Sequence, residues 1–152
     1  MCQHPNIINL VDLFENSDHY YIVLDYMQGG DLYGYLESRQ YSLKEDRVRE
    51  LGYQIALGLK YLHSYGIVHR DLKLENVMMT NRTDNSIPEL VDFGLAKMIG
   101  PNERATEPFG TLGYTAPEII SKKPYSFSCD LWSLGCIIYA LLCGCLPFDH
   151  KK

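Results

Sequence analysis

Four residues in the middle of the chain are of types that could do chemistry together. Asp71, Lys73 and Asn76 lie within one short segment, and Asp92 follows further along. A carboxylate, an ammonium group and an amide oxygen can orient a hydroxyl and neutralise phosphate charge, which are the main needs of phosphoryl transfer. Taken singly, each acidic residue could equally be a surface carboxylate or a helix cap. The grouping therefore carries the prediction, and no single residue does.

Three motifs in order give this grouping a family context. The segment 69–76 reads His-Arg-Asp-Leu-Lys-Leu-Glu-Asn, 92–94 reads Asp-Phe-Gly, and 116–118 reads Ala-Pro-Glu. Their order and spacing resemble the catalytic loop, the magnesium loop and the end of the activation segment of the eukaryotic protein kinase family. One three-residue match would carry almost no weight, whereas three matches in order favour the family strongly.

The resemblance implies a role for each of the four polar residues. Asp71 would be the catalytic base that orients the substrate hydroxyl and accepts its proton. Lys73 would stabilise the charge that develops on the transferred phosphoryl group. Asn76 and Asp92 would ligate Mg²⁺ through hard oxygen donors. The cofactors that the resemblance implies are therefore ATP and Mg²⁺.

A second segment resembles the hinge that binds adenine between the two kinase lobes. In Leu-Asp-Tyr-Met at 24–27, the backbone of Asp25 and Met27 would hydrogen-bond adenine, and Leu24 would be the gatekeeper. Met78 would form the floor under the adenine ring. An ordinary core methionine is an equally good interpretation of Met78, and both can hold.

Two acidic residues, Asp31 and Glu75, complete the predicted ATP-binding set and also bear on the substrate. Asp31 lies where the family contacts the ribose or a basic substrate residue. Two acids facing the substrate groove favour a peptide with Arg or Lys a few residues before the acceptor. Together with Leu-Pro-Phe at 146–148, this feature weakly resembles the calcium/calmodulin-dependent group, although the sequence contains no EF-hand loop.

The residues around Lys73 also indicate the acceptor. A lysine two residues after the catalytic aspartate resembles serine/threonine kinases. Thr111, which follows Gly110 and precedes Tyr114, resembles the serine/threonine docking loop and would hydrogen-bond both Asp71 and Lys73. Protein substrates with Ser/Thr acceptors are therefore the expected partners.

Arg70 suggests how the activation segment is held. This cation needs a partner, and family members often supply a phosphorylated threonine. Glu107 stands at that position, four residues before Thr111. We therefore hypothesise that Glu107 pairs with Arg70, and with Lys97, as a permanently acidic contact; the neighbouring Thr106 is the alternative phosphorylation site.

The elements that must position these residues follow from hydrophobic periodicity. Residues 10–14 and 20–24 are predicted to form two strands joined by a polar turn. Asp31 then caps a short helix that ends at about Glu37. A Ser-Leu-Lys-Glu capping box at 42–45 predicts a long amphipathic helix over 43–64. Three short apolar pieces follow, the last two separated by polar residues as a hairpin requires: 67–68, 77–79 and 89–91.

The last predicted element is a helix over 130–143. It is apolar nearly all round and is therefore expected to be buried. Asp130, near its start, would bond backbone amides of the catalytic loop, as the family resemblance implies. The apolar run 134–146 is too short to span a bilayer, which needs about 20 apolar residues, so no membrane span is expected.

Composition and charge exclude several protein classes. The 152 residues are 46% hydrophobic and 22% charged, which is typical of a globular domain and excludes disorder, collagen and coiled coil. The net charge of −5 argues against a nucleic-acid partner, because such domains are usually basic. Without a secretory signal, the expected compartment is intracellular, and cytoplasmic in particular.

The five cysteines agree with a reducing compartment, because their number is odd and no Cys-x-x-Cys pair occurs. Cys143 and Cys145 could be a metal or redox pair. Small buried residues of a helix are the better interpretation of these two side chains.

The predicted fold class is α+β and protein-kinase-like, in one partial domain. Residues 1–28 would form the end of the small lobe and the hinge, with a two-stranded sheet, and 29–152 an incomplete, mostly helical large lobe. The Gly-rich loop and its partner lysine are absent, so hinge, Asn76 and Asp92 alone would hold the nucleotide. Two functions remain open: a serine/threonine kinase present as a fragment, and a catalytically impaired kinase-like scaffold or decoy.

Overall fold

The computed structural model of the protein describes residues 3–148 and contains short strands and a few helices. In chain order the elements are β1 (Leu10–Glu15), β2 (Tyr20–Leu24), α1 (Leu32–Ser38), α2 (Glu45–Ser64), β3 (Ile67–Val68), the 3₁₀ turn η1 (Leu74–Asn76), β4 (Val77–Met79), β5 (Pro88–Leu90), β6 (Lys97–Met98), α3 (Pro117–Ile120) and α4 (Ser128–Cys143). This content agrees with the predicted α+β class.

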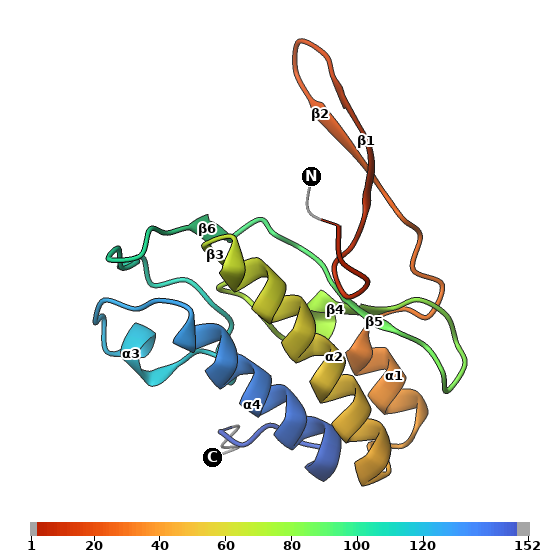
Figure 1. Ribbon diagram of the computed structural model, residues 1–152. Coiled ribbons are helices and arrows are strands. Elements are labelled where there is room, and N and C mark those ends of the chain that lie inside the picture. The colour runs from red at the N-terminus through yellow and green to blue at the C-terminus, as the bar shows by residue number, and fades with distance from the viewer. Residues whose placement is uncertain (1–2, 149–152) are drawn as a thin grey trace.

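The core lies in the helical body, where α2 and α4 pack side by side (Figure 1). The apolar residues that recur at helical spacing along α2 are all buried, as the periodicity predicts. They meet the buried face of α4 and the inner side of α1. The largest fully buried side chains of this contact include Leu32, Leu36, Leu51, Ile55, Leu59, Ile137 and Leu141.

The antiparallel hairpin of β1 and β2 projects away from this body (Figure 1). Its two strands and its turn agree with the prediction. Every residue of β2 is exposed, and so is every residue of β1 after Leu10. The hairpin therefore has no buried face, although its residues are mostly apolar.

Two further antiparallel pairs frame the loops that carry the polar residues. β4 pairs with β5, which confirms the predicted hairpin, and β3 pairs with β6. The backbone around the start of α1 joins the β4–β5 pair, because Gly29 donates to the carbonyl of Met79 and Met79 donates to that of Gly30. Asp31 caps α1 by accepting a hydrogen bond from the Gly34 amide at 2.7 Å, as predicted.

The start of α2 differs from the prediction. The helix begins at Glu45 with Lys44 as its N-cap, and no side chain makes a capping hydrogen bond. The capping box at 42–45 is therefore wrong. The Glu45 carboxylate forms an ion pair with Arg49 one turn along the helix at 2.9 Å, so it does not reach back to Ser42.

Three short elements were not predicted from the sequence. They are η1, β6 and α3, and all three are too short to show a periodicity. The isolated bridge between Ala105 and Tyr125 joins the loop after β6 to the segment before α4. These contacts hold the activation segment against the helical body.

The helix α4 runs from Ser128 to Cys143, and its C-cap Gly144 has a φ of 74°, which is left-handed and favours glycine. Cys129 and Cys136 are buried, but Cys143 and Cys145 are exposed, so their interpretation as buried residues is wrong. They lie at the helix end, where the chain turns away from the core. Cys2 lies outside the described residues.

Within residues 3–148, none of the helices is long and apolar enough to cross a membrane. That part of the chain also holds no group of three or more His, Cys, Asp or Glu side chains arranged to bind a metal ion.

Candidate active site

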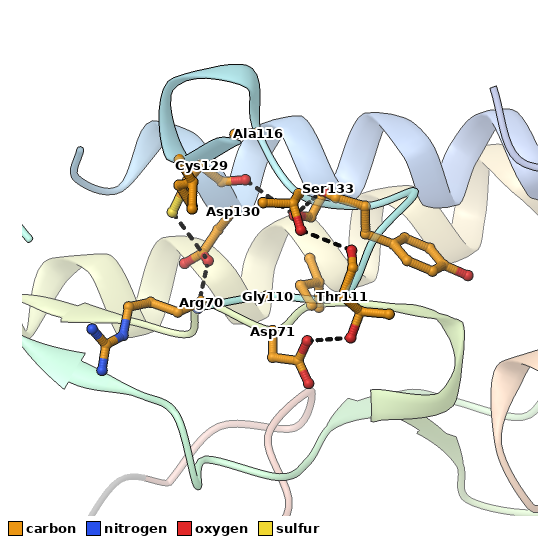
Figure 2. A pocket seen from close by; sticks show the side chains of 12 residues that line it. Arg70, Asp71, Gly110, Thr111, Ala116, Cys129, Asp130 and Ser133 are labelled. Carbon is orange, nitrogen blue, oxygen red and sulfur yellow. Dashed lines mark hydrogen bonds between the residues drawn. The ribbon is translucent and has the colours of Figure 1, made fainter. Parts of the chain in front are cut away.

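Both oxygens of the Asp71 carboxylate are engaged by other side chains. Thr111 donates its hydroxyl to Oδ1 at 2.7 Å, and Figure 2 shows the two side chains pointing toward each other. Lys73 Nζ lies 3.0 Å from Oδ2, and Asn76 Nδ2 donates to the same oxygen at 3.2 Å. Lys73 also donates to the Thr111 hydroxyl at 3.1 Å, so the expected contacts of Thr111 are present.

The β4–β5 pair brings Asn76 close to the Asp-Phe-Gly segment. The Val91 amide donates to the carbonyl of Asn76, so Asp92 follows directly after the residue bonded to Asn76. Asn76 is buried, and its side-chain amide nitrogen donates to the carbonyl and to the carboxylate of Asp71. Its side-chain oxygen remains available as an acceptor. Asp92 accepts a hydrogen bond from the Gly94 amide through Oδ1.

These two residues fit Mg²⁺ by the chemistry of their donors. Mg²⁺ prefers oxygen ligands, and proteins hold it through one or two carboxylates together with substrate phosphates. Asp92 supplies a carboxylate and Asn76 an amide oxygen. Among the described residues no group of three or more His, Cys, Asp or Glu side chains could hold a metal ion by itself, so phosphate and water would have to complete the coordination.

Asp130 of α4 anchors the catalytic loop. Its carboxylate is 1% exposed and accepts hydrogen bonds from the backbone amides of His69 and Arg70, both at 2.9 Å. Figure 2 shows Asp130 reaching from α4 toward the loop. These bonds confirm the predicted anchor. His63, at the end of α2, also contacts the carboxylate at 2.8 Å and was not predicted; its sequence signal was a polar residue on a mostly apolar helix end.

Two residues of the site have a left-handed backbone. Arg70 has a φ of 70° and Asp92 a φ of 58°, and neither is glycine. Such conformations cost about 1–3 kcal/mol each and concentrate at functional sites. At Arg70 the two amides bonded to Asp130 hold the loop. The ring of His69 supports it further by donating to the Val91 carbonyl at 2.9 Å and by packing against Phe93.

Glu107 holds the activation segment through both of its carboxylate oxygens. Oε2 lies 3.2 Å from Arg70, and Oε1 lies 2.7 Å from Lys97, so the predicted ion pairs are present. The hydrogen bond from Lys97 is the main reason that the pKa of Glu107 falls to about 2. Thr106 is exposed and only donates its backbone amide to this carboxylate.

Two aromatic residues of this cluster escaped the sequence interpretation. Tyr125 donates its hydroxyl to the carbonyl of Glu107 at 2.7 Å. Arg70 lies over the ring of Phe109, with its guanidinium carbon 4.9 Å from the ring centre. Each is an aromatic residue in a polar loop, and this feature could have marked it as a contact residue. The sequence does not show which group each one contacts.

The residues expected to bind adenine, Asp25 and Met27, lie outside the network around Asp71. Met27 is buried and Asp25 is exposed. Met78 is half-buried between two buried neighbours of β4, and it forms a backbone bridge with Asp31. Its partial burial leaves both interpretations of this methionine open. Glu75 lines a cavity that Thr111 also lines.

Comparison with known proteins agrees with this geometry. The family model described as "Protein kinase domain" matches residues 1–152. The chain is 42% identical over 149 residues to SNF1-related protein kinase catalytic subunit alpha KIN12 of Arabidopsis thaliana, covering 98% of this chain and 29% of that protein. It is 41% identical over 151 residues to serine/threonine-protein kinase PLK4 of Xenopus laevis, covering 97% and 16%.

The chain thus spans less than a third of the length of these relatives. The similarity nonetheless extends over nearly all of its residues, including the three motifs and the polar network around Asp71. On these grounds, the chain belongs to the protein kinase domain family.

Proposed function

We propose that the protein is a serine/threonine kinase that transfers the γ-phosphoryl group of ATP to hydroxyl groups of protein substrates. The observation that carries the proposal is the network in which Lys73, Asn76 and Thr111 all contact the Asp71 carboxylate. The names of the two relatives support the same reaction, since both are called protein kinases.

The side chains of the network suit this reaction. Asp71 would accept the proton of the substrate hydroxyl, and its bonds to Thr111 and Asn76 fix the direction in which its oxygens point. Lys73 would neutralise charge on the transferred group while it remains bonded to Thr111. Mg²⁺, held by Asn76 and Asp92, would neutralise the phosphates of the nucleotide.

The test is phosphate transfer from labelled ATP to a Ser/Thr peptide by the protein that carries this chain. Asp71→Asn should reduce the rate by about 100- to 10,000-fold, the usual contribution of a general base. Asp18→Asn is the matched control, because Asp18 is an exposed carboxylate in the turn of the β1–β2 hairpin. Equal rates for the two variants would mean that the signal comes from a contaminating kinase. Binding of ATP and peptide without transfer would instead favour the scaffold function.

Glu107 is proposed to make activity independent of activation-segment phosphorylation. Its carboxylate already occupies Arg70 and Lys97, and a pKa of about 2 keeps it ionised at any physiological pH. This contact supplies the negative charge that a phosphorylated residue would otherwise bring to Arg70. Phosphorylation of Thr106 is the competing explanation.

Two variants separate these explanations. Glu107→Ala should lower kcat strongly, because Arg70 loses its acidic partner and the segment loses an anchor. Thr106→Ala and phosphatase treatment should leave kcat unchanged. The opposite pattern, with activity lost on Thr106→Ala and kept on Glu107→Ala, would overturn the proposal.

A further inference from the structure

Two exposed thiols lie at the end of α4, separated by one glycine. Cys143 is the last residue of the helix, Gly144 is its C-cap, and Cys145 follows. Both cysteines are exposed. Their exposure removes the interpretation as small buried residues and leaves open the metal or redox pair that the sequence also allows.

The turn at Gly144 brings the two cysteines within reach of each other. Two residues of fully extended chain span at most about 7 Å. Gly144 has a φ of 74° and a ψ of 4°, which is a left-handed turn, so the Cα atoms on either side of it lie closer than that limit. A disulfide joins Cα atoms that are about 4.4–6.8 Å apart. The backbone therefore suits a bridge between Cys143 and Cys145.

The neighbouring Tyr139 shows that both sulfurs share one environment. It lies one helical turn before Cys143, on the same face of α4. The charge of the Cys143 sulfur is the main reason that the pKa of Tyr139 is raised, and a hydrogen bond with the same side chain and the charge of the Cys145 sulfur add to the shift. The phenol thus stays protonated and can donate to a thiolate, the form of cysteine that reacts with disulfides.

The other two cysteines that the structure describes differ in these respects. Cys129 and Cys136 are buried. Burial raises the pKa of both thiols, which keeps them in the unreactive protonated form. Oxidation within residues 3–148 should therefore be confined to the end of α4.

The chain after Cys145 contacts the loop that positions the catalytic carboxylate. Cys145 and Thr111 line the same cavity of about 740 Å³. The next residue, Leu146, lies against the loop at Gly113, where a Cβ would meet Leu146 Cδ1 at 3.0 Å. Thr111 lies two residues before Gly113 and donates to the Asp71 carboxylate. A displacement at the helix end would therefore be passed through Leu146 to this hydrogen bond.

We infer that Cys143 and Cys145 form a redox-sensitive dithiol that closes to a reversible disulfide and thereby lowers the activity of the neighbouring site. The effect on activity rests on the proposed kinase function, whereas formation of the disulfide does not. The oxidant is a small-molecule disulfide such as glutathione disulfide. Exposed disulfides are easily reduced, which suits a reversible modification.

The reaction consists of two exchange steps. One cysteine thiolate attacks the small disulfide, whose S–S bond breaks to leave a mixed disulfide and release one thiol. The second cysteine thiolate then attacks the protein sulfur of the mixed disulfide and releases the other thiol. The two cysteines lose two electrons and two protons, and the small disulfide takes them up as two thiols.

The first experiment follows the bridge without catalysis. The protein that carries this chain is incubated with glutathione disulfide and digested, and peptides that contain residues 143–145 but neither Cys129 nor Cys136 are analysed by mass spectrometry. Wild type should give a peptide lighter by two hydrogen atoms, and dithiothreitol should restore its mass. Cys143→Ser and Cys145→Ser each lack one thiol and should retain a mixed disulfide with glutathione. Two free thiols or two bound glutathiones in the wild-type peptide would overturn the inference.

The second experiment compares kcat/KM for a Ser/Thr peptide before and after the same treatment. Oxidation should lower kcat/KM of wild type by about 10-fold or more, because small displacements of catalytic groups reduce the rate strongly. Dithiothreitol should restore it. The double variant Cys143→Ser/Cys145→Ser should keep its rate in glutathione disulfide. Cys2→Ser is the matched control, because it removes a different thiol, and it should respond as wild type does.

Two outcomes of the second experiment would overturn the effect on activity. One is an equal loss in the double variant, and the other is a bridged wild-type protein whose rate is undiminished. If the bridge forms but neither the reduced nor the oxidised protein phosphorylates any Ser/Thr peptide, the proposed function fails and the disulfide site stands.

Discussion

The catalytic loop and the β1–β2 hairpin are held in opposite ways. In the loop, buried polar groups converge on one another, as at Asp130, which is 1% exposed and accepts two backbone amides. In the hairpin, the ladder between the two strands is the main contact, and apolar side chains such as Ile22 remain exposed. One region is stabilised by burial and the other by strand pairing alone.

The difference shows where the geometry of the site comes from. A two-stranded hairpin is at best marginally stable without a packed face. A loop whose amides are bonded to a buried carboxylate cannot move without leaving those groups unsatisfied. The residues around Asp71 are therefore fixed by the helical body, and the hairpin contributes little to their position.

Among these variants, Asp130→Ala should lower the free energy of unfolding most. It leaves the amides of His69 and Arg70 without an acceptor and should lower the free energy of unfolding by about 3–5 kcal/mol. Urea denaturation followed by circular dichroism measures the loss. Asp18→Ala, an exposed change in the hairpin turn, should shift the same free energy by about 0.5 kcal/mol or less. Similar losses in the two variants would contradict the contrast.

A pair of isoleucines tests the apolar contribution. Ile55 lies on α2 and is fully buried, so Ile55→Ala should lower the free energy of unfolding by about 2–5 kcal/mol. Ile22 is 64% exposed in β2, and Ile22→Ala should cost about 0.5 kcal/mol or less. Thermal and urea unfolding of both variants measure the difference. A cost at Ile22 as large as that at Ile55 would show that the hairpin has a packed face.

Replacing Glu89 in β5 should have the smallest effect on stability, and this effect should depend on pH. Burial raises its pKa to about 6, and the nearby charge of Asp25 adds to the shift. A raised pKa means that the folded state favours the protonated form, so this group's contribution to stability is full below about pH 4.5 and is lost as pH rises through about 6. Glu89→Gln should therefore stabilise the protein by about 1 kcal/mol at pH 7.5, after allowing for partial exposure.

The measurement for Glu89 compares urea midpoints at pH 5 and at pH 7.5. The gain in Glu89→Gln should be clear at the higher pH and small at the lower one. Glu15→Gln, an exposed change at the end of β1, is the control and should show no gain. A gain of equal size at both pH values would rule out ionisation of Glu89 as the cause.

Sequence patterns predicted the regular secondary structure of the fold. The buried positions of α2 follow from helical periodicity. The projecting hairpin and the β4–β5 pair follow from apolar runs separated by polar residues. The contacts of Thr111, Glu107 and Asp130 were expected from motif resemblance and are present. Their roles in catalysis stay predictions.

The remainder depends on contacts between distant segments. The residues next to Tyr125 in the sequence do not indicate that its hydroxyl bonds the Glu107 carbonyl. The residues next to His63 likewise do not indicate its contact with the Asp130 carboxylate. Tyr33 and Tyr41 have their rings in contact after the chain turns through two successive left-handed residues, Gln40 and Tyr41. The capping box failed for a local reason, since the Glu45 carboxylate forms an ion pair with Arg49 one turn along its own helix.

The position of Asp130 also has a consequence for the order of folding. Its carboxylate joins residues 61 and 60 positions earlier in the chain, and contacts of such long sequence separation form slowly because loop closure must precede them. The catalytic loop is therefore expected to acquire its shape late, after α4 has docked on α2. Until that docking occurs, the chain can hold its helices without yet holding the arrangement around Asp71.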